Sequence, residues 1–301
     1  MALLSSTLGK RQETAKRISE NQSQLGLIIF RFKKNKLAMV GMVIILIMMI
    51  ASLAAPLYID PSLVYRQSMQ DRFLTPSSDH WFGTDQFGRD LFARVVFGGR
   101  ISLVSGLVVV AMCMFAGILL GGASGYFGGK VDEVIMRICD IFLAVPRMLL
   151  AMAVVASLGQ GTFNMLLALA VADFAIYARV VRSSIMNLRD LEYVEAAKCC
   201  GTSSARIIFK HLLPNGMGPV IVTATLGLGG TILAIAALGF LGIGVASPTP
   251  EWGTILAENR TNIRNFPHLG IIPGMSIAIA AMCLNFVGDG MRDALDPRTK
   301  N

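Results

Sequence analysis

A charged segment, EAAKCCGTSSARIIFKHLLPN at residues 195–215, lies between two long apolar runs. Within it, Glu195 is followed by Ala196 and Ala197, and Gly201 stands four residues later. A helix with small side chains can sit deep in a groove of a partner protein, while a neighbouring carboxylate fixes its orientation by pairing with a basic group. Gly201 is placed to end that helix, since glycine adopts the left-handed C′ conformation without steric penalty. The residue types fit docking onto a partner and fit an ordinary solvated loop helix equally well, so both interpretations stay open at this point.

A second set of polar residues lies inside the apolar runs, where a charge costs about 2.5–3.5 kcal/mol at mid-membrane. Asp173 is near the middle of its run, so we expect it to face protein or water. Arg137 and Asp140 are three residues apart on one helix face and can pair. Arg147 follows Pro146, where a helix can kink. Either these residues line a translocation path or they join helices internally; we favour internal pairing for Arg137 and Asp140, and leave both readings open for Asp173.

Catalytic and metal chemistry find little support in the chain. Asp140 and Asp173 form the obvious carboxylate pair, but they lie at different predicted depths. The stretch GASGYFGGKV is not a P-loop, because no Ser or Thr follows Lys130. The histidines fall in separate loops, at His80, His211 and His268. We therefore expect no catalytic residue, no metal and no cofactor bound by this chain, so the energy for any active process must come from a partner.

Composition indicates the solvent in which the chain folds. Of its 301 residues, 54% are hydrophobic and only 15% are charged, whereas soluble proteins carry about 25% charged residues. The net charge of +8 comes mostly from residues before the first apolar run. This placement is typical of a cytoplasmic segment before a first span. The positive charge therefore does not need nucleic-acid binding to explain it. The sequence predicts an all-α membrane protein.

Apolar runs of span length predict six transmembrane helices, with both termini in the cytoplasm. We place the spans at 37–57, 101–124, 133–158, 163–182, 219–245 and 269–287. Residues 1–36 form a cytoplasmic tail with an interfacial helix, 37–290 form the membrane domain with a cytoplasmic loop at 183–218, and 291–301 form a cytoplasmic tail. Trp252, in the predicted outer loop 246–268, is expected at the membrane interface or on a surface for a substrate-delivering protein.

Local patterns in the cytoplasmic loop predict two short helices. Asp190 can cap the first, which runs to Cys200, and Thr202 or Ser203 can cap the second. The second carries four aliphatic residues (Ile207, Ile208, Leu212 and Leu213), and we expect Pro214 to close it.

The full spacing of EAA, three residues, Gly201 and then Leu213-Pro214 resembles the EAA motif of the membrane subunits of bacterial ABC importers. GTDQFGRDLFARVVFGGRISL (83–103), GYFGGKVDEVIMRICDIFLAVP (125–146), ALGFLGIGVASPTPEWG (237–253) and GDGMRDALDP (288–297) look like the dipeptide/oligopeptide/nickel group of these permeases, and most like its second permease subunit. The similarity covers roughly residues 30–298. One departure is His211, where the motif usually has isoleucine.

The resemblance implies a type I ABC importer permease in the bacterial inner membrane. Its implied partners are a sister permease forming a heterodimer, two ATPase subunits that hold ATP and Mg²⁺, an extracytoplasmic binding protein and membrane lipid. It implies that six residues couple the chain to the ATPase: Glu195, Ala196, Ala197, Gly201, Leu213 and Pro214. The cargo stays open among dipeptides, longer peptides, glutathione-like compounds and nickel or a metal chelate. The alternatives are an ion-coupled secondary transporter or channel and an intramembrane enzyme.

A glycine ridge in the second span has two readings. Gly117, Gly121 and Gly125 recur every four residues, which places them on one helix face where a neighbour can approach closely. The neighbour is either a helix of this chain or the second permease.

Overall fold

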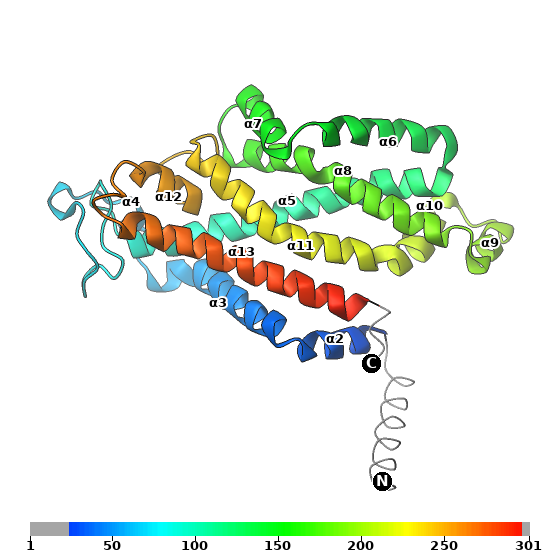
Figure 1. Cartoon of the computed structure of the whole chain (residues 1–301), viewed down its shortest axis with the longest axis horizontal. Coiled ribbons are helices and arrows are strands. Elements are labelled where there is room, and N and C mark those ends of the chain that lie inside the picture. The colour runs from blue at the N-terminus through cyan, green and yellow to red at the C-terminus, as the bar shows by residue number, and fades with distance from the viewer. Residues whose placement is uncertain (1–23, 297–301) are drawn as a thin grey trace, which may run out of the picture.

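The computed structural model describes residues 24–296, and its regular structure there is helical throughout. Five unbroken helical stretches are long and apolar enough to cross a membrane: α3 (Lys36–Tyr58), α5 (Leu91–Phe127), α8 (Thr162–Leu188), residues Ser204–Phe240 ending in α11 (Leu213–Phe240), and α13 (His268–Leu295). A sixth span is formed by α6 (Gly129–Ala144) and α7 (Arg147–Leu158), which meet at a bend of 93°. The six predicted spans are therefore present, with the third one broken (Figure 1).

The break in the third span follows from Pro146. Proline has no N–H to donate, and its ring clashes with the carbonyl group four residues before it. It also disfavours helical dihedral angles at the preceding residue. Val145 accordingly has extended dihedral angles, φ −94° and ψ 133°. The kink expected at Pro146 is present, and α7 leaves it in a new direction.

The glycine ridge of α5 packs within this chain. A Cβ on Gly121 would stand 2.3 Å from the carbonyl oxygen of Ala178, and one on Gly117 would stand 2.6 Å from Cβ of Tyr177. Both contacts lie on α8, so the two helices approach more closely than any side chain would allow. This settles the alternative that the sequence left open in favour of packing inside the subunit.

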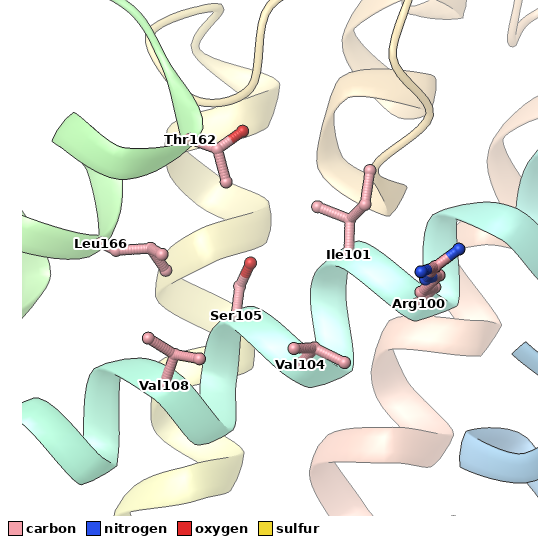
Figure 2. A pocket seen from close by; sticks show the side chains of 7 residues that line it. All are labelled: Arg100, Ile101, Val104, Ser105, Val108, Thr162 and Leu166. Atoms are coloured by element: carbon pink, nitrogen blue, oxygen red, sulfur yellow. The ribbon is translucent and has the colours of Figure 1, made fainter. Parts of the chain in front are cut away.

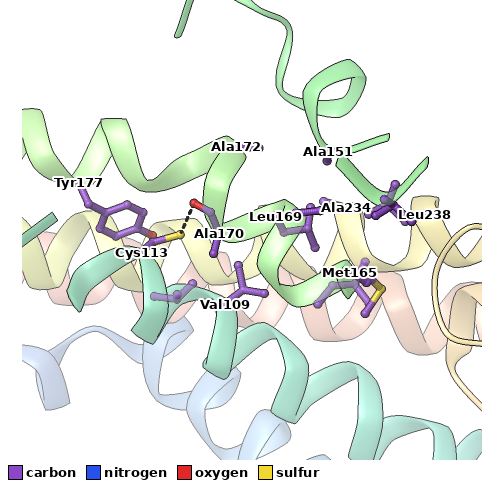
Figure 3. Packing of buried hydrophobic residues seen from close by; sticks show 14 of the residues in the cluster. Val109, Cys113, Ala151, Met165, Leu169, Ala170, Ala172, Tyr177, Ala234 and Leu238 are labelled. Atoms are coloured by element: carbon purple, nitrogen blue, oxygen red, sulfur yellow. Dashed lines mark hydrogen bonds between the residues drawn. The ribbon is translucent and has the colours of Figure 1, made fainter. Parts of the chain in front are cut away.

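Two apolar clusters fill the bundle. One joins α5, α7, α8 and α11 around residues such as Val109, Met165 and Leu169, and the thiol of Cys113 contacts the carbonyl oxygen of Ala170 at 3.7 Å (Figure 3). The other joins α3, α5, α11, α13 and α12 (Trp252–Asn259), and Trp252 is 2% exposed within it.

The two ends of the bundle carry different loops (Figure 1). The loop with α9 (Glu192–Cys199) extends from one end, while α4 (Ser62–Tyr65), the 3₁₀ turn η1 (Met69–Asp71) and α12 lie at the other. The helix α2 (Gln24–Lys34) reaches the end of α13, where Arg31 donates to the carbonyl oxygen of Asp296 at 3.2 Å. The start of the first span and the end of the last therefore lie together, as a six-span topology requires. Residues 1–23 and 297–301 of the two predicted tails lie outside the described residues.

The second span begins ten residues earlier than predicted. Asp90 is the N-cap of α5, and its side chain accepts a hydrogen bond from the backbone N–H of Ala93 at 2.7 Å. Such a cap satisfies an N–H that the first helical turn leaves free. The helix thus starts in the polar motif GTDQFGRD, where hydropathy gave no signal.

Candidate functional site

The helix α9 ends as its sequence predicts. Gly201 has φ +74° at C′, its N–H bonds to the carbonyl of Lys198 at 2.9 Å, and the N–H of Thr202 bonds to the carbonyl of Ala197 at 3.1 Å. These two bonds form a Schellman motif, which satisfies the carbonyls that a helix end leaves free. The start differs from the prediction: Leu191 is the N-cap and no side chain caps it, while Asp190 stands one residue before it, with Oδ2 3.4 Å from Nε of Arg189.

A single buried side chain anchors α9 on the bundle. Val194 is fully buried in an apolar cluster with Val181 and Ile185 of α8 and with the segment after α9. Lys198 adds a contact over the ring of Tyr126 on α5, with 5.9 Å to the ring centroid. The predicted docking residues lie on other faces: Glu195 and Ala196 are exposed and Ala197 is half-buried. The anchor therefore leaves a shallow, small-residue face with one carboxylate open to a partner.

The segment after α9 corrects the prediction that Pro214 closes a separate helix. The chain runs on through α10 (Ser204–Arg206) and a π-helical stretch η2 (Ile207–Leu212) directly into α11. In η2 the N–H of Leu213 reaches back to the carbonyl of Ile208, five residues before. The wider turn changes the hydrogen-bond pattern just before Pro214, whose missing N–H is tolerated in the first turn of α11. The predicted pair splits: Leu213 is buried in the core and Pro214 is exposed.

The polar residues of the spans form pairs between helices. Asp173 of α8 is 6% exposed, and its Oδ2 lies 2.7 Å from Nη2 of Arg147, the first residue of α7. This ion pair bridges α8 and the far side of the α6–α7 break. Asp140 of α6 pairs with Arg179 of α8, not with Arg137, so the predicted pair within α6 is wrong. An arginine three residues before an acid is the weaker order along a helix, and the facing helix supplies a better partner.

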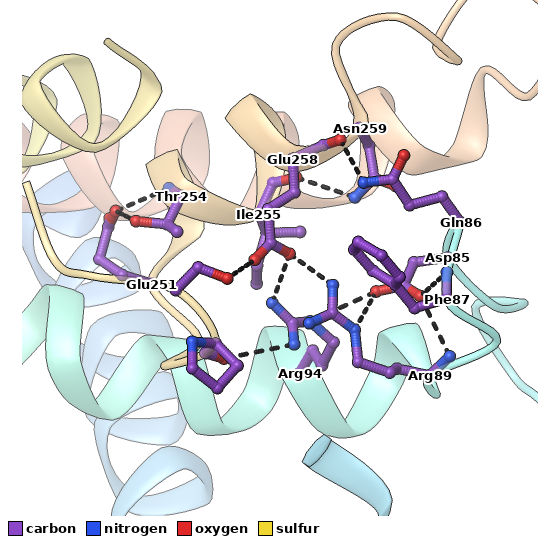
Figure 4. A network of polar contacts seen from close by, with 12 residues as sticks. Asp85, Gln86, Phe87, Arg89, Arg94, Glu251, Thr254, Ile255, Glu258 and Asn259 are labelled. Atoms are coloured by element: carbon purple, nitrogen blue, oxygen red, sulfur yellow. Dashed lines mark hydrogen bonds and ion pairs between the residues drawn. The ribbon is translucent and has the colours of Figure 1, made fainter. Parts of the chain in front are cut away.

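A buried charge network at the opposite end was missed by the sequence analysis (Figure 4). Arg89 and Arg94 both contact Oε2 of Glu258, at 2.5 and 2.8 Å, and Nε of Arg89 lies 2.6 Å from Oδ2 of Asp85. The side chains of Asp85 and Arg94 are completely buried. Asp85 and Arg89 flank a turn and do not lie on a helix, so their spacing of four gave no helical pairing signal. Glu258 lies far along the chain, so the sequence could not reveal the third partner.

The network joins two segments of the outer end. Besides its ion pairs, Glu258 accepts a hydrogen bond from Ser247 at 2.6 Å, and its carbonyl accepts one from Gln86 at 2.9 Å. It therefore ties the loop before α5 to α12 and to the loop that precedes α12. Two positive and two negative side chains share the site, so the buried charges balance.

The start of α12 adds a further buried carboxylate. Glu251 is the N-cap, and it accepts hydrogen bonds from the N–H groups of Gly253 and Thr254, each at 2.9 Å, and from Ser102 at 3.0 Å. Burial raises the pKa of this carboxyl above its ordinary value, although the hydrogen bonds oppose the shift. Trp252 follows it and donates from Nε1 to the carbonyl of Val95 at 2.9 Å. The prediction that Trp252 serves at an interface or outer surface is wrong, because α12 folds back onto α5 and buries it.

A groove of about 260 Å³ lies between α5 and α8 (Figure 2). Its lining is mainly aliphatic, with Arg100 at one end and the hydroxyl groups of Ser105 and Thr162. No acid–base pair or nucleophile with a base lines it, so it offers no catalytic constellation. Within residues 24–296, no three His, Cys, Asp or Glu side chains are placed to hold a metal ion.

Comparison with known families matches two parts of the chain. Residues 115–301 match the family described as binding-protein-dependent transport system inner membrane component. Residues 23–76 match the N-terminal transmembrane domain of oligopeptide transport permease C. The first match holds α9 and the broken span, and the second holds α2 and α3.

Several relatives are similar over three quarters of the chain or more. The dipeptide transport system permease protein of Alkalihalophilus pseudofirmus is 46% identical over 90% of this chain and 89% of its own. The oligopeptide transport system permease protein of Bacillus subtilis is 38% identical over 90% and 89%. The glutathione transport system permease protein of Pectobacterium atrosepticum is 42% identical over 75% of each chain.

A solved structure shares the fold. A chain of the MetNI methionine ABC transporter, in an inward-facing conformation, superposes with a TM-score of 0.54 and 19% identity, covering 68% of this chain and 98% of that one. This likeness supports the predicted architecture of a type I importer permease, and the family assignment sets aside the enzyme, the channel and the ion-coupled transporter. A permease of this kind works with ATPase partners and a binding protein. The chain belongs to the family of binding-protein-dependent transport system inner membrane components, as a multi-pass permease subunit of an ABC importer.

Proposed function

We propose that this chain forms half of an import path for peptides or a chemically similar small solute. Its relatives are named for dipeptides, oligopeptides and glutathione, and all of these cargoes carry peptide-like amides and charged ends. The other half of the path is a sister permease, and two ATPase subunits complete the membrane complex. The binding protein delivers the cargo to the end of the bundle that carries α12.

The exposed face of α9 carries this proposal. Ala196 and Ala197 let the helix sit deep in a cleft of an ATPase subunit, and Glu195 sets its orientation by pairing with a basic group there. Gly201 ends the helix and turns the chain back to the bundle. Leu213 and Pro214 then lead into α11, so pressure on α9 reaches a span directly.

ATP and Mg²⁺ are held by the ATPase partners, and this chain supplies the mechanical link. Closure of the two ATPases on ATP moves α9 and tilts the attached spans. The cavity between the two permeases then changes from outward to inward facing. This division of labour requires no covalent chemistry from the chain.

Asp173 and Arg147 belong to the path in this proposal. The break at Pro146 leaves irregular backbone at membrane depth, which is tolerated only where protein or a water-filled cavity covers it. The ion pair of Asp173 and Arg147 stands beside that break. Arg137 and Asp140 lie on α6 before the break, and the contact of Asp140 with Arg179 of α8 gives Asp140 a role in joining helices.

The coupling role is tested by reversing one charge. Glu195→Lys should leave the chain inserted in the membrane but abolish ATP-driven uptake of radiolabelled dialanine in proteoliposomes holding the whole complex. Arg206→Glu is the matched control, because Arg206 is also exposed in this loop but lies beyond Gly201. Normal uptake by the Glu195→Lys complex would overturn the role of α9.

Proximity gives a second test that does not depend on the cargo. Cys199 and Cys200 are exposed on α9 and its cap, so a bifunctional thiol reagent should join this chain to the ATPase in membrane vesicles. Cross-links only to other proteins would contradict the docking model. For the path, Asp173→Asn should reduce uptake while the complex still assembles; intact uptake would remove Asp173 from it.

A further inference from the structure

The inner ends of α5, α6 and α8 meet at one ion pair that the coupling proposal has not used. Asp132, in the first turn of α6, accepts two hydrogen bonds from Arg182 of α8: Nε to Oδ1 at 2.5 Å and Nη2 to Oδ2 at 2.6 Å. Ser124 of α5 donates to the same carboxylate at 2.5 Å. The side chains of Arg182 and Asp132 are 30% and 18% exposed. A two-pronged arginine–carboxylate contact fixes direction as well as distance.

The connection from α5 to α6 gives little rigidity of its own. Gly128 and Gly129 join the two helices, with φ of +64° and +51°. Glycine populates this left-handed region freely and restrains the chain least. Without a side-chain contact, the inner end of α6 would be free to pivot about these two residues. Asp132 stands three residues after this joint, where it can stop that movement.

The connection from α9 to α8 is stiff by contrast. The N–H of Leu191 bonds to the carbonyl of Leu188, and the N–H of Val194 bonds to the carbonyl of Leu191. Two consecutive hydrogen-bonded turns therefore connect α8 to α9. Arg189 also donates to the carbonyl of Gly125 at 3.1 Å, which ties the end of α8 to α5. A displacement of α9 is therefore shared by α8 and α5.

We propose that Asp132 and Arg182 are positioning residues that carry the movement of α9 into α6, and through it to the break at Pro146. The pair makes α5, α6, α8 and α9 one rigid unit at the inner end. The proposal rests on the coupling role of α9 and adds the route by which its motion reaches the broken span.

The chain provides its own control for this idea. Asp140 and Arg179 pair the same two helices, but their side chains are 46% and 51% exposed. This second pair lies eight residues farther along α6, away from Gly128 and Gly129. Asp140→Ala therefore removes an equal charge from the same helix without releasing the joint at Gly128 and Gly129.

The direct test measures whether α6 follows α9. Spin labels at Val134→Cys and Tyr193→Cys, in a chain with Cys199→Ser and Cys200→Ser, report the distance between the two helices in the whole complex. The distance should be the same without nucleotide and with ATP trapped by vanadate. Adding Asp132→Ala should broaden the distribution and make it differ between the two states, whereas adding Asp140→Ala should leave it as in the labelled parent.

Transport gives the second readout. Asp132→Ala should lower uptake of radiolabelled dialanine per ATP hydrolysed by about tenfold, a typical size for coupling between sites. Exchanging the charges, Asp132→Arg with Arg182→Asp, should restore much of the loss, which a merely weakened fold would not allow. An unchanged label distance in the Asp132→Ala chain would overturn the proposal. Co-purification of the ATPase with the Asp132→Ala chain shows separately whether α9 still docks. Loss of the ATPase would concern the docking of α9, whereas an unchanged label distance would concern only the role of Asp132 and Arg182.

Discussion

The outer and inner ends of this permease use charge in opposite ways. At the outer end, Arg89, Arg94 and Glu258 are withdrawn from water and paired with one another across two segments. At the inner end, Glu195 is exposed on α9, and Val194 is the buried side chain that holds that helix. The first arrangement satisfies its charges inside the chain. The second leaves its carboxylate exposed, as the proposed docking onto an ATPase requires.

The two arrangements should respond differently to mutation, because the charges of the outer end stabilise the fold and the exposed charge of the inner end does not. Breaking a buried ion pair leaves an uncompensated charge, so such a network resists distortion strongly. An exposed carboxylate can be replaced with little effect on folding, because water already solvates it. Changes at the outer end should therefore damage the fold, and changes at the inner end should damage coupling while the fold survives.

The largest effect on stability is expected from Glu258→Ala. It would leave Arg89 and Arg94 buried without their shared carboxylate oxygen, and losses of this kind are about 3–5 kcal/mol. The measurement is the thermal unfolding midpoint of the detergent-solubilised chain, together with the amount of folded protein in the membrane.

The control for that variant is Arg179→Ala, which removes one partner of the exposed pair on α6 and α8. We expect a smaller loss than for Glu258→Ala, because the side chain of Asp140 is 46% exposed and is not left as a buried, unpaired charge. Equal midpoints for Glu258→Ala and Arg179→Ala would show that burial does not separate the two ends.

Gly201→Val should give a smaller loss of stability and a large loss of uptake. Gly201 has φ +74°, and no atom lies within 4 Å of the place where a Cβ would go. The cost of a side chain there is therefore strain in the backbone dihedral angles and not a clash with a neighbour. A side chain in the left-handed region costs about 1–2 kcal/mol. The helix end would rearrange and turn the docking face of α9 away from its partner.

The matched control is Gly201→Asn, since asparagine visits the left-handed region more readily than other side chains. Uptake should fall in the order glycine, asparagine, valine. If asparagine and valine were equally inactive while both chains stayed folded, the conformation of Gly201 would not be the cause.

The pH dependence of stability sharpens the picture of the outer end. Burial raises the pKa of Glu251 above its ordinary value of 4.5, so the folded state favours the protonated carboxyl. Its stabilising contribution is present below that ordinary value and is lost as the pH rises through the raised folded-state pKa. Glu251→Gln keeps a neutral group at this position. The unfolding midpoint of the variant minus that of the parent should therefore increase as the pH rises through this window. A difference that stays constant with pH would contradict the assignment.

The sequence predicted those features that depend on neighbouring residues. The six spans, the kink at Pro146 and the turn at Gly201 follow from hydropathy, from a missing N–H and from permitted dihedral angles. Features that need distant residues were missed. Arg94 and Glu258 both lie outside the predicted spans, and 164 positions separate them, so no local pattern links the two. Trp252 was placed at an outer surface, because nothing local shows that α12 folds back onto α5.

The π-helical stretch before Pro214 shows a different limit. Proline marks a helix end in most sequence patterns, and here it was taken as one. The chain instead widens the turn at Ile207–Leu212 and continues as one span. Burial of the aliphatic cluster around Leu212 stabilises this continuous helix. Tertiary packing thus overrides a local stop signal at the point where the segment after α9 joins the bundle.

The smallest effect on folding, and the sharpest contrast with Glu258, is expected from Ala196→Leu. Ala196 is exposed on α9, and leucine forms helices nearly as well as alanine, so the unfolding midpoint should change by under about 0.5 kcal/mol. The larger side chain fills the shallow face that a cleft of the ATPase would have to accommodate. Uptake of radiolabelled dialanine should then fall steeply while the folded chain remains in the membrane at parental levels. Ala205→Leu is the control, because Ala205 is also exposed but lies in α10, outside the docking helix. Equal losses of uptake for the two variants would mean that added bulk anywhere in the loop is harmful, whereas a loss confined to Ala196→Leu would show that the inner end is shaped for a partner.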